Sequence, residues 1–160
     1  MRGNEIVLSA QPQGKFEEGF INNAVAPGIC MEIVPGVGMV GGRARWRPTT
    51  RAAGASGAIV VLREDRLQGF TQTSVYAIGT VCFLYWPIAG EELNMQVEVP
   101  GTGTGTITSI GQRFSVAGDG SGALTLAAGT WAPFSCKEAA IDLAAPGAEL
   151  VWVQFLGAAA

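Results

Sequence analysis

The chain has 160 residues, enough for one domain with a hydrophobic core, and 48% of its residues are hydrophobic while only 14% are charged. Its formal net charge of −3 lacks the cationic excess that neutralises nucleic-acid phosphates, so we expect no nucleic-acid partner. The chain has no histidine, which removes the usual general base, the Ser-His and Cys-His nucleophile pairs and the commonest transition-metal ligand.

The N-terminal residues 1–13 are expected to form an arm, and they lack the apolar stretch that a secretory signal carries. A single β domain is expected over residues 14–160. The 23 glycines and 8 prolines are spread throughout and cut the chain into short segments typical of sheets. We predict strands near residues 5–9, 20–23, 29–34, 58–63, 75–85, 93–99, 106–110, 113–116, 123–127 and 149–155.

The fold class that follows is all-β, a small antiparallel β-barrel or a jelly-roll-like sandwich with an extended N-terminal segment and a long Arg-rich loop. Segments 58–63 and 149–155 have apolar residues on both faces, which favours positions inside the barrel or sandwich. The Gly-rich residues 117–122 predict a hairpin turn. Residues 137–143 have near-helical apolar spacing and predict a short helix, with a strand as the alternative. The most apolar stretch, residues 75–88, is too short for a membrane helix, so no membrane contact is expected.

Residues 41–57 are rich in Gly, Arg, Ala and Thr without a firm period, and we expect them to form an exposed excursion. Guanidinium groups bind carboxylates bidentately and stack on aromatic rings, so this segment predicts either a docking patch for a protein partner or a solvated loop. The candidate partner-binding residues are Arg43, Arg45, Trp46, Arg47 and Arg51. On the docking hypothesis, the arginines pair with acidic groups of the partner, and replacing Arg43, Arg45 and Arg47 together leaves the melting temperature nearly unchanged.

We expect no catalytic residues, no cofactor and no metal site. The adjacent acids at residues 17–18, 64–65 and 91–92 are interpreted as solvated turn residues rather than a glycosidase pair, because neighbours on a strand point to opposite faces. The Gly-Thr run at 101–106 is interpreted as a flexible loop, and Asp119 as part of a turn rather than a calcium loop. The three widely spaced cysteines are expected to be reduced core thiols: Cys30, Cys82 and Cys136.

The succession of turns resembles that of the short decoration, or cement, proteins of tailed bacteriophages. The chain opens with GNEIVL at residues 3–8, followed by GKFEEG at 14–19 and APG at 26–28. Later segments are similar to the Gly-acid and Gly-Asp turns of that family: GEEL at 90–93, IGQRF at 110–114 and GDGSGAL at 118–124. Residues 136–155 resemble its closing small-residue segment, Pro-Gly turn and apolar strand, whereas residues 41–53 match no part of the pattern.

This resemblance implies a structural virion protein that binds the outer surface of a phage head and cements neighbouring capsid subunits, without enzymatic activity. The implied partners are the major capsid protein and further copies of the chain in a dimer or trimer. The implied location is the virion, after assembly in the host cytoplasm.

The alternatives are a carbohydrate-binding or host-adhesion β-sandwich and a hydrolase that uses carboxylates alone. Glycan binding requires at least two tryptophan rings exposed on one face, chosen from Trp46, Trp86, Trp131 and Trp152.

Overall fold

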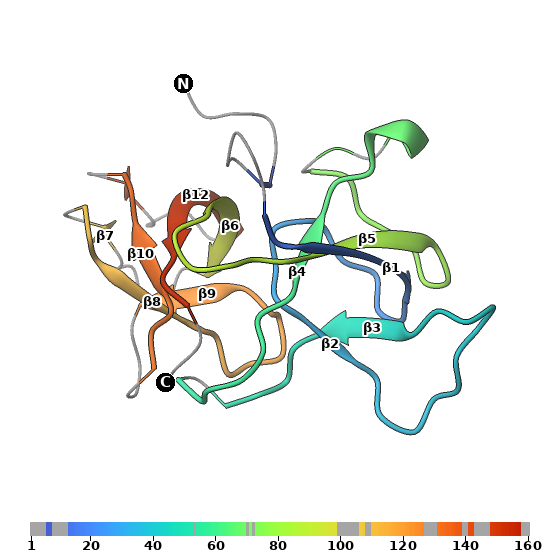
Figure 1. Ribbon diagram of the computed structural model, residues 1–160. Helices are drawn as coiled ribbons and strands as arrows, with labels where there is room; N and C mark the ends of the chain where they lie inside the picture. Colours follow the sequence, from blue (N-terminus) through green and yellow to red (C-terminus); the bar gives the residue numbers. More distant parts are fainter. Residues whose placement is uncertain are drawn as a thin grey trace.

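The computed structural model describes residues 6–7, 13–52, 54–69, 71, 73–98, 106–107, 110–126, 131–138, 141–142 and 148–157. These residues form strands and one 3-10 turn, with no α-helix among them, and the all-β prediction is confirmed (Figure 1). The described part of the chain therefore contains no helix that could span a membrane. The elements are β1 (Lys15–Ile21), β2 (Met31–Ile33), β3 (Arg45–Pro48), β4 (Val61–Arg63), η1 (Arg66–Gln68), β5 (Val81–Trp86), β6 (Glu92–Glu98), β7 (Thr106–Ile107), β8 (Arg113–Val116), β9 (Leu124–Leu126), β10 (Phe134–Cys136), β11 (Ile141–Asp142) and β12 (Ala148–Phe155).

One half of the fold is a closed barrel in the order β10-β12-β6-β9-β8, and the other is a five-stranded sheet in the order β2-β3-β1-β5-β4. Figure 1 shows the two side by side, with the barrel strands in yellow to red. Among the paired strands, β1 with β3 and β6 with β9 run parallel, and the remaining pairs are antiparallel. The prediction of an antiparallel barrel is therefore confirmed, except that its strands β6 and β9 pair in parallel.

The five-stranded sheet curls toward closure, because its two outer segments also hydrogen-bond to each other. The Gly28 amide donates to the Leu62 carbonyl at 2.8 Å, and the Met31 amide donates to the Val60 carbonyl at 2.8 Å. This pairing leaves neither outer segment with a fully open edge, and open edges are the usual route to uncontrolled strand association. The enclosed core contains Ile21, Ile29, Met31, Trp46, Val60, Leu62, Tyr76, Cys82 and Leu84.

Successive side chains of β4 and β5 pack alternately into the barrel core and the sheet core, and this joins the two halves of the fold. Val61 and Tyr85 pack into the core of the barrel, whereas Leu62 and Leu84 pack into the core of the sheet. The prediction that residues 58–63 are apolar on both faces is thus confirmed, since this segment lies between two cores. The hairpin turn at residues 117–122 is also confirmed, and the Cys30 amide donates to the Gly122 carbonyl there at 2.7 Å.

Strand β6 alternates apolar and polar residues, but neither of its faces is fully solvated. Leu93, Met95 and Val97 lie in the barrel core, as the pattern predicts. The opposite face is also covered, because Asn94 is buried and the Gln96 side-chain amide donates to the Pro27 carbonyl at 2.7 Å.

Three sequence predictions about local structure are wrong or incomplete. The excursion at residues 41–57 contains β3, and its inward side chains are buried, so only parts of it are exposed. The helix at 137–143 is wrong and its strand alternative is confirmed for Ile141–Asp142, which forms β11 paired with β7; residues 139–140 and 143 lie outside the described residues. Of the predicted N-terminal arm and the strand at 5–9, residues 6 and 7 are buried and Val7 pairs with Leu93, while residues 1–5 and 8–12 lie outside the described residues. The Gly-Thr run at 101–105 lies outside them too.

Candidate functional site

Trp46 belongs to the core of the five-stranded sheet and does not stand exposed among the arginines. It points inward from β3, is 1% exposed, and packs edge-on against Trp86 with ring centroids 6.3 Å apart. Its indole covers Gly19, where an added Cβ would lie 2.3 Å from Trp46 Cδ1. The prediction that Trp46 docks a partner from an exposed Arg-rich loop is therefore wrong, because the period-2 alternation of β3 turns the indole inward.

Three of the four arginines around Trp46 make side-chain hydrogen bonds within their own chain, whereas the buried Nε of Arg45 has no hydrogen-bond partner. Arg43 Nε donates to Glu18 Oε2 at 2.8 Å, and Arg47 Nε donates to Glu32 Oε1 at 2.9 Å. Arg51 donates to the Thr49 hydroxyl and to the Ala58 carbonyl. Arg45 and Arg47 are half-buried, and only Arg43 is well exposed. The fold thus distributes these side chains over separate contacts instead of gathering them into one patch.

Among the acids that these arginines contact, Glu32 accepts hydrogen bonds from three side chains. Besides Arg47, it accepts hydrogen bonds from the hydroxyls of Thr49 at 3.0 Å and Thr50 at 2.8 Å. Burial alone would raise the pKa of Glu32, but the hydrogen bonds from Thr50, Thr49 and Arg47 outweigh it and lower the pKa below its usual value.

Arg47→Ala is expected to lower the free energy of unfolding by about 1 kcal/mol, because it removes a hydrogen bond to a partly buried carboxylate. Arg43→Ala should cost less than about 0.5 kcal/mol, since both partners of its ion pair are largely exposed. Urea denaturation of the two variants checks this difference. Equal stabilities would contradict the structural role given to Arg47, and the triple replacement is no longer expected to be neutral.

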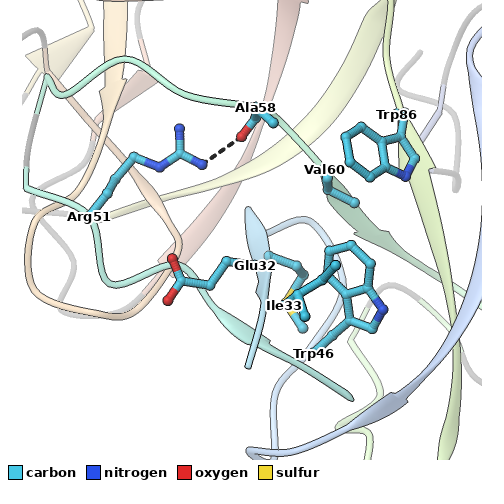
Figure 2. Close-up of a pocket in the computed structure, with 8 residues that line it drawn as sticks. Glu32, Ile33, Trp46, Arg51, Ala58, Val60 and Trp86 are labelled. Atoms are coloured by element: carbon cyan, nitrogen blue, oxygen red, sulfur yellow. Dashed lines mark hydrogen bonds between the residues drawn. The ribbon is translucent and has the colours of Figure 1, made fainter. Parts of the chain in front are cut away.

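An apolar slot lies between β2 and residues 58–60, where the two segments separate after pairing at Met31 and Val60. Figure 2 shows its walls, with Trp46 and Trp86 at one end and Arg51 hydrogen-bonded to Ala58 at the other. Its volume is about 180 Å³, and its apolar lining consists of Met31, Ile33, Trp46, Ala58, Val60 and Trp86. Trp86 is held in place by its Nε1, which donates to Glu17 Oε2 at 3.0 Å. We call this cavity the apolar slot.

Residues 33–43, between β2 and β3, form an exposed apolar hairpin (Figure 1). The amides and carbonyls of Val40 and Arg43 bond reciprocally at 3.0 Å, and Gly41 and Gly42 between them have φ of 57° and 77°. Two positive φ angles are typical of a type I′ turn. Its exposed large hydrophobic side chains are Ile33, Val37, Met39 and Val40. The sequence carries a signal for this hairpin that we missed, the Gly-Gly pair between Val40 and Arg43.

The buried carboxylates act as hydrogen-bond acceptors for the backbone. Glu64, Asp65 and Glu91 are buried, so interpreting their pairs as solvated turn residues is wrong. Glu64 Oε2 accepts from the Ile6 amide at 3.1 Å, and Asp65 Oδ1 accepts from the Leu67 amide at 3.0 Å. Within the described part of the chain, no three His, Cys, Asp or Glu side chains gather to hold a metal ion.

The three cysteines are buried free thiols, as predicted. Burial raises the pKa of Cys30 to about 12, only partly offset by Arg51, and it raises the pKa of Cys82 to about 12 as well. Thiols with such pKa values form little thiolate near neutral pH and are poor nucleophiles.

The tryptophans do not form the platform that glycan stacking needs. Trp46 and Trp131 are buried, and Trp86 and Trp152 are half-buried. Trp152 Nε1 donates to Glu92 Oε2 at 3.1 Å, as Trp86 Nε1 does to Glu17. The condition of two exposed rings on one face is therefore not met.

Comparison with known proteins gives no family for this chain. No protein-family model matches the chain, and no curated protein matches it either. The features that remain for a functional argument are the apolar hairpin, the apolar slot and the internal use of the charged groups.

Proposed function

We propose that this chain is a non-catalytic structural protein of a phage virion, which binds the outer surface of the head and cements neighbouring capsid subunits. The observation that carries the proposal is the apolar hairpin, which gathers in one segment four of the eleven large hydrophobic side chains that are exposed among the described residues. Exposed apolar groups gathered in one segment are typical of protein contact sites. The resemblance of the turn motifs to cement proteins supplies the identity of the partner.

The charge distribution supports the same proposal. Glu32, Glu91 and Arg47 contribute to folding contacts inside the chain, which leaves few of the charged groups of the site available for a ligand. A contact surface built from neutral side chains loses little when salt screens charges. We therefore expect a capsid contact that depends on apolar burial more than on ion pairs.

Purified protein added to undecorated heads is expected to bind in a fixed ratio to capsid subunits, and electron micrographs of the heads give the occupancy. Occupancy should change little between low and moderate salt, because the contact is mainly apolar. Heads that already carry a decoration protein are the control.

Failure to bind undecorated heads would reject the proposal. Binding that disappears at moderate salt would instead indicate an exposed charged group, such as Arg43 at the base of the hairpin, as the main contact. Binding to a glycan in place of the capsid would favour the carbohydrate-binding alternative, and turnover of a substrate would favour the hydrolase.

A further inference from the structure

We propose that two copies of this chain form a symmetric dimer in which the apolar hairpin of each copy inserts Met39 into the apolar slot of the other. The proposal goes beyond capsid binding and does not depend on it. Because the dimer covers Met39, a capsid would contact the hairpin of the dimer only through the side chains that stay outside this contact. It rests on the size, charge and position of the two surfaces.

The slot is the right size for one large aliphatic side chain. Its volume is about 180 Å³, and a cavity of about 150 Å³ lined by apolar side chains holds a benzene molecule. Its two indole walls are fixed before any partner arrives, Trp46 by packing on Gly19 and Trp86 by its hydrogen bond to Glu17. A preformed cavity loses little conformational entropy on binding.

The hairpin has the shape of an inserting element. Met39 is 70% exposed, and its unbranched side chain adapts readily to an irregular cavity. Four glycines surround it in the tip, and a Cβ added at any of them would meet nothing within 4 Å: Gly36, Gly38, Gly41 and Gly42. The tip is therefore narrow and stands clear of its own body.

The charges of the two surfaces also match. Residues 35–42 contain no charged side chain. Glu32 at the slot accepts from Arg47, Thr49 and Thr50. Arg51, at the end away from the two indoles (Figure 2), donates to Thr49 and Ala58 and lies over the Trp131 ring, while its Nη1 has no hydrogen-bond partner. A neutral tip brings no further charge into the slot, whereas a charged tip would be buried there without a counter-charge of its own.

A second copy is the occupant because the two surfaces are continuous. Ile33 lines the slot and also begins the hairpin, so tip and cavity belong to one patch of the molecule. In an isologous dimer, a patch must be complementary to itself, and residue pairs exchange across the two-fold axis. An axis beside Ile33 would let each tip enter the slot of the other copy.

Sedimentation velocity of the full chain tests the proposal, with wild-type protein expected at twice the mass of one chain. Met39→Asp, which alters the tip, and Ile33→Asp, which alters the slot, should each weaken the dimer at least tenfold, equal to about 1.4 kcal/mol. The control is Leu67→Asp, which makes the same chemical change at a 97% exposed position on η1 and should dimerise like the wild type. Far-ultraviolet circular dichroism confirms that each variant is folded.

Ala58→Phe, which fills the slot from an exposed position, provides a second slot variant. A mixture of Met39→Asp with Ala58→Phe should recover part of the dimer, because one intact tip then meets one intact slot. Wild-type protein that is monomeric up to about 100 µM, the range of weak association, would overturn the proposal. The proposal would also be overturned if Met39→Asp dimerised as strongly as the wild type, even if that variant had lost capsid binding. A mixture of Met39→Asp and Ala58→Phe that formed no heterodimer would overturn it as well.

Discussion

Glu91→Ala is expected to lower the free energy of unfolding by about 3 kcal/mol or more, one of the largest effects of any single replacement in this chain. Glu91 is 6% exposed and connects three parts of the fold. Its Oε1 accepts from the Tyr85 hydroxyl, and from the Gln13 amide at 2.7 Å, while its Oε2 accepts from the Ile88 amide at 2.9 Å. The carboxylate thus holds the chain entering β1 against the turn between β5 and β6.

The size of the effect follows from the donors that alanine would leave behind. The Tyr85 hydroxyl bond is buried, and the bonds from the Gln13 and Ile88 amides are partly buried. A buried donor without an acceptor costs about 1–3 kcal/mol, a partly buried one less, and the costs of neighbouring groups are not additive. Urea denaturation measures the difference. Glu18→Ala is the control, since its ion pair with Arg43 is largely exposed and should be worth less than about 0.5 kcal/mol. Similar losses for the two variants would mean that Glu91 does not act as the structural acceptor described above.

The pH dependence of stability provides a second measurement of Glu91. Burial alone would raise its pKa, but hydrogen bonds from Tyr85, Ile88 and Gln13 outweigh this and lower the pKa in the folded chain. A carboxyl whose folded pKa is lowered contributes its stability above its unfolded pKa of about 4.3 and loses it as pH falls through the folded value. The stability difference between wild type and Glu91→Gln should therefore be constant near neutral pH and shrink below about pH 4. A difference that grows in acid would contradict this.

The sequence predicted the strands whose local pattern matches their burial. Strand β8 has the predicted bounds, and β6 and β12 lie within one residue of theirs. Strand β3 was missed because two arginines flank Trp46 and make the segment look solvated. Its pattern, with half-buried residues alternating with buried ones, is nevertheless that of a strand. The arginine side chains cover the outer face, and the Arg47 guanidinium reaches Glu32 on the neighbouring strand β2.

The site could not be predicted from the sequence because its contacts join distant segments. The arginine cluster suggested a partner with acidic groups, yet the acids are Glu18 and Glu32 of the same chain, 25 and 15 residues away from their arginines. Only the β2-β3-β1 order of the sheet brings them together. The apolar slot combines residues from β2, β3 and β5 with residues 58–60, and its volume depends on where two segments separate, which no local pattern encodes.

The junction between the two halves of the fold should be equally sensitive, and Gly122→Ala is expected to cost about 3 kcal/mol or more. Gly122 has a φ of +73°, which strains any L-residue, and an added Cβ would lie 2.3 Å from the Cys30 carbonyl oxygen. That oxygen accepts from the Thr49 amide at 3.0 Å, so it cannot retreat without losing a hydrogen bond. Relief of the collision must move the β8–β9 turn away from the sheet and break the bond from the Cys30 amide to the Gly122 carbonyl.

Gly120→Ala in the same turn is the matched control, because it shares the strain without the collision. Its φ is +83°, and the nearest atom to its added Cβ is Thr50 Cγ2 at 4.0 Å. The strain alone is worth about 1–2 kcal/mol, and for a domain of this size each kcal/mol lowers the melting temperature by about 2–4 °C. Thermal unfolding should therefore separate the variants clearly, with Gly122→Ala melting lower. Equal melting temperatures would mean that the turn does not approach Cys30 closely in solution, and that the two halves are joined mainly through Val61 and Tyr85.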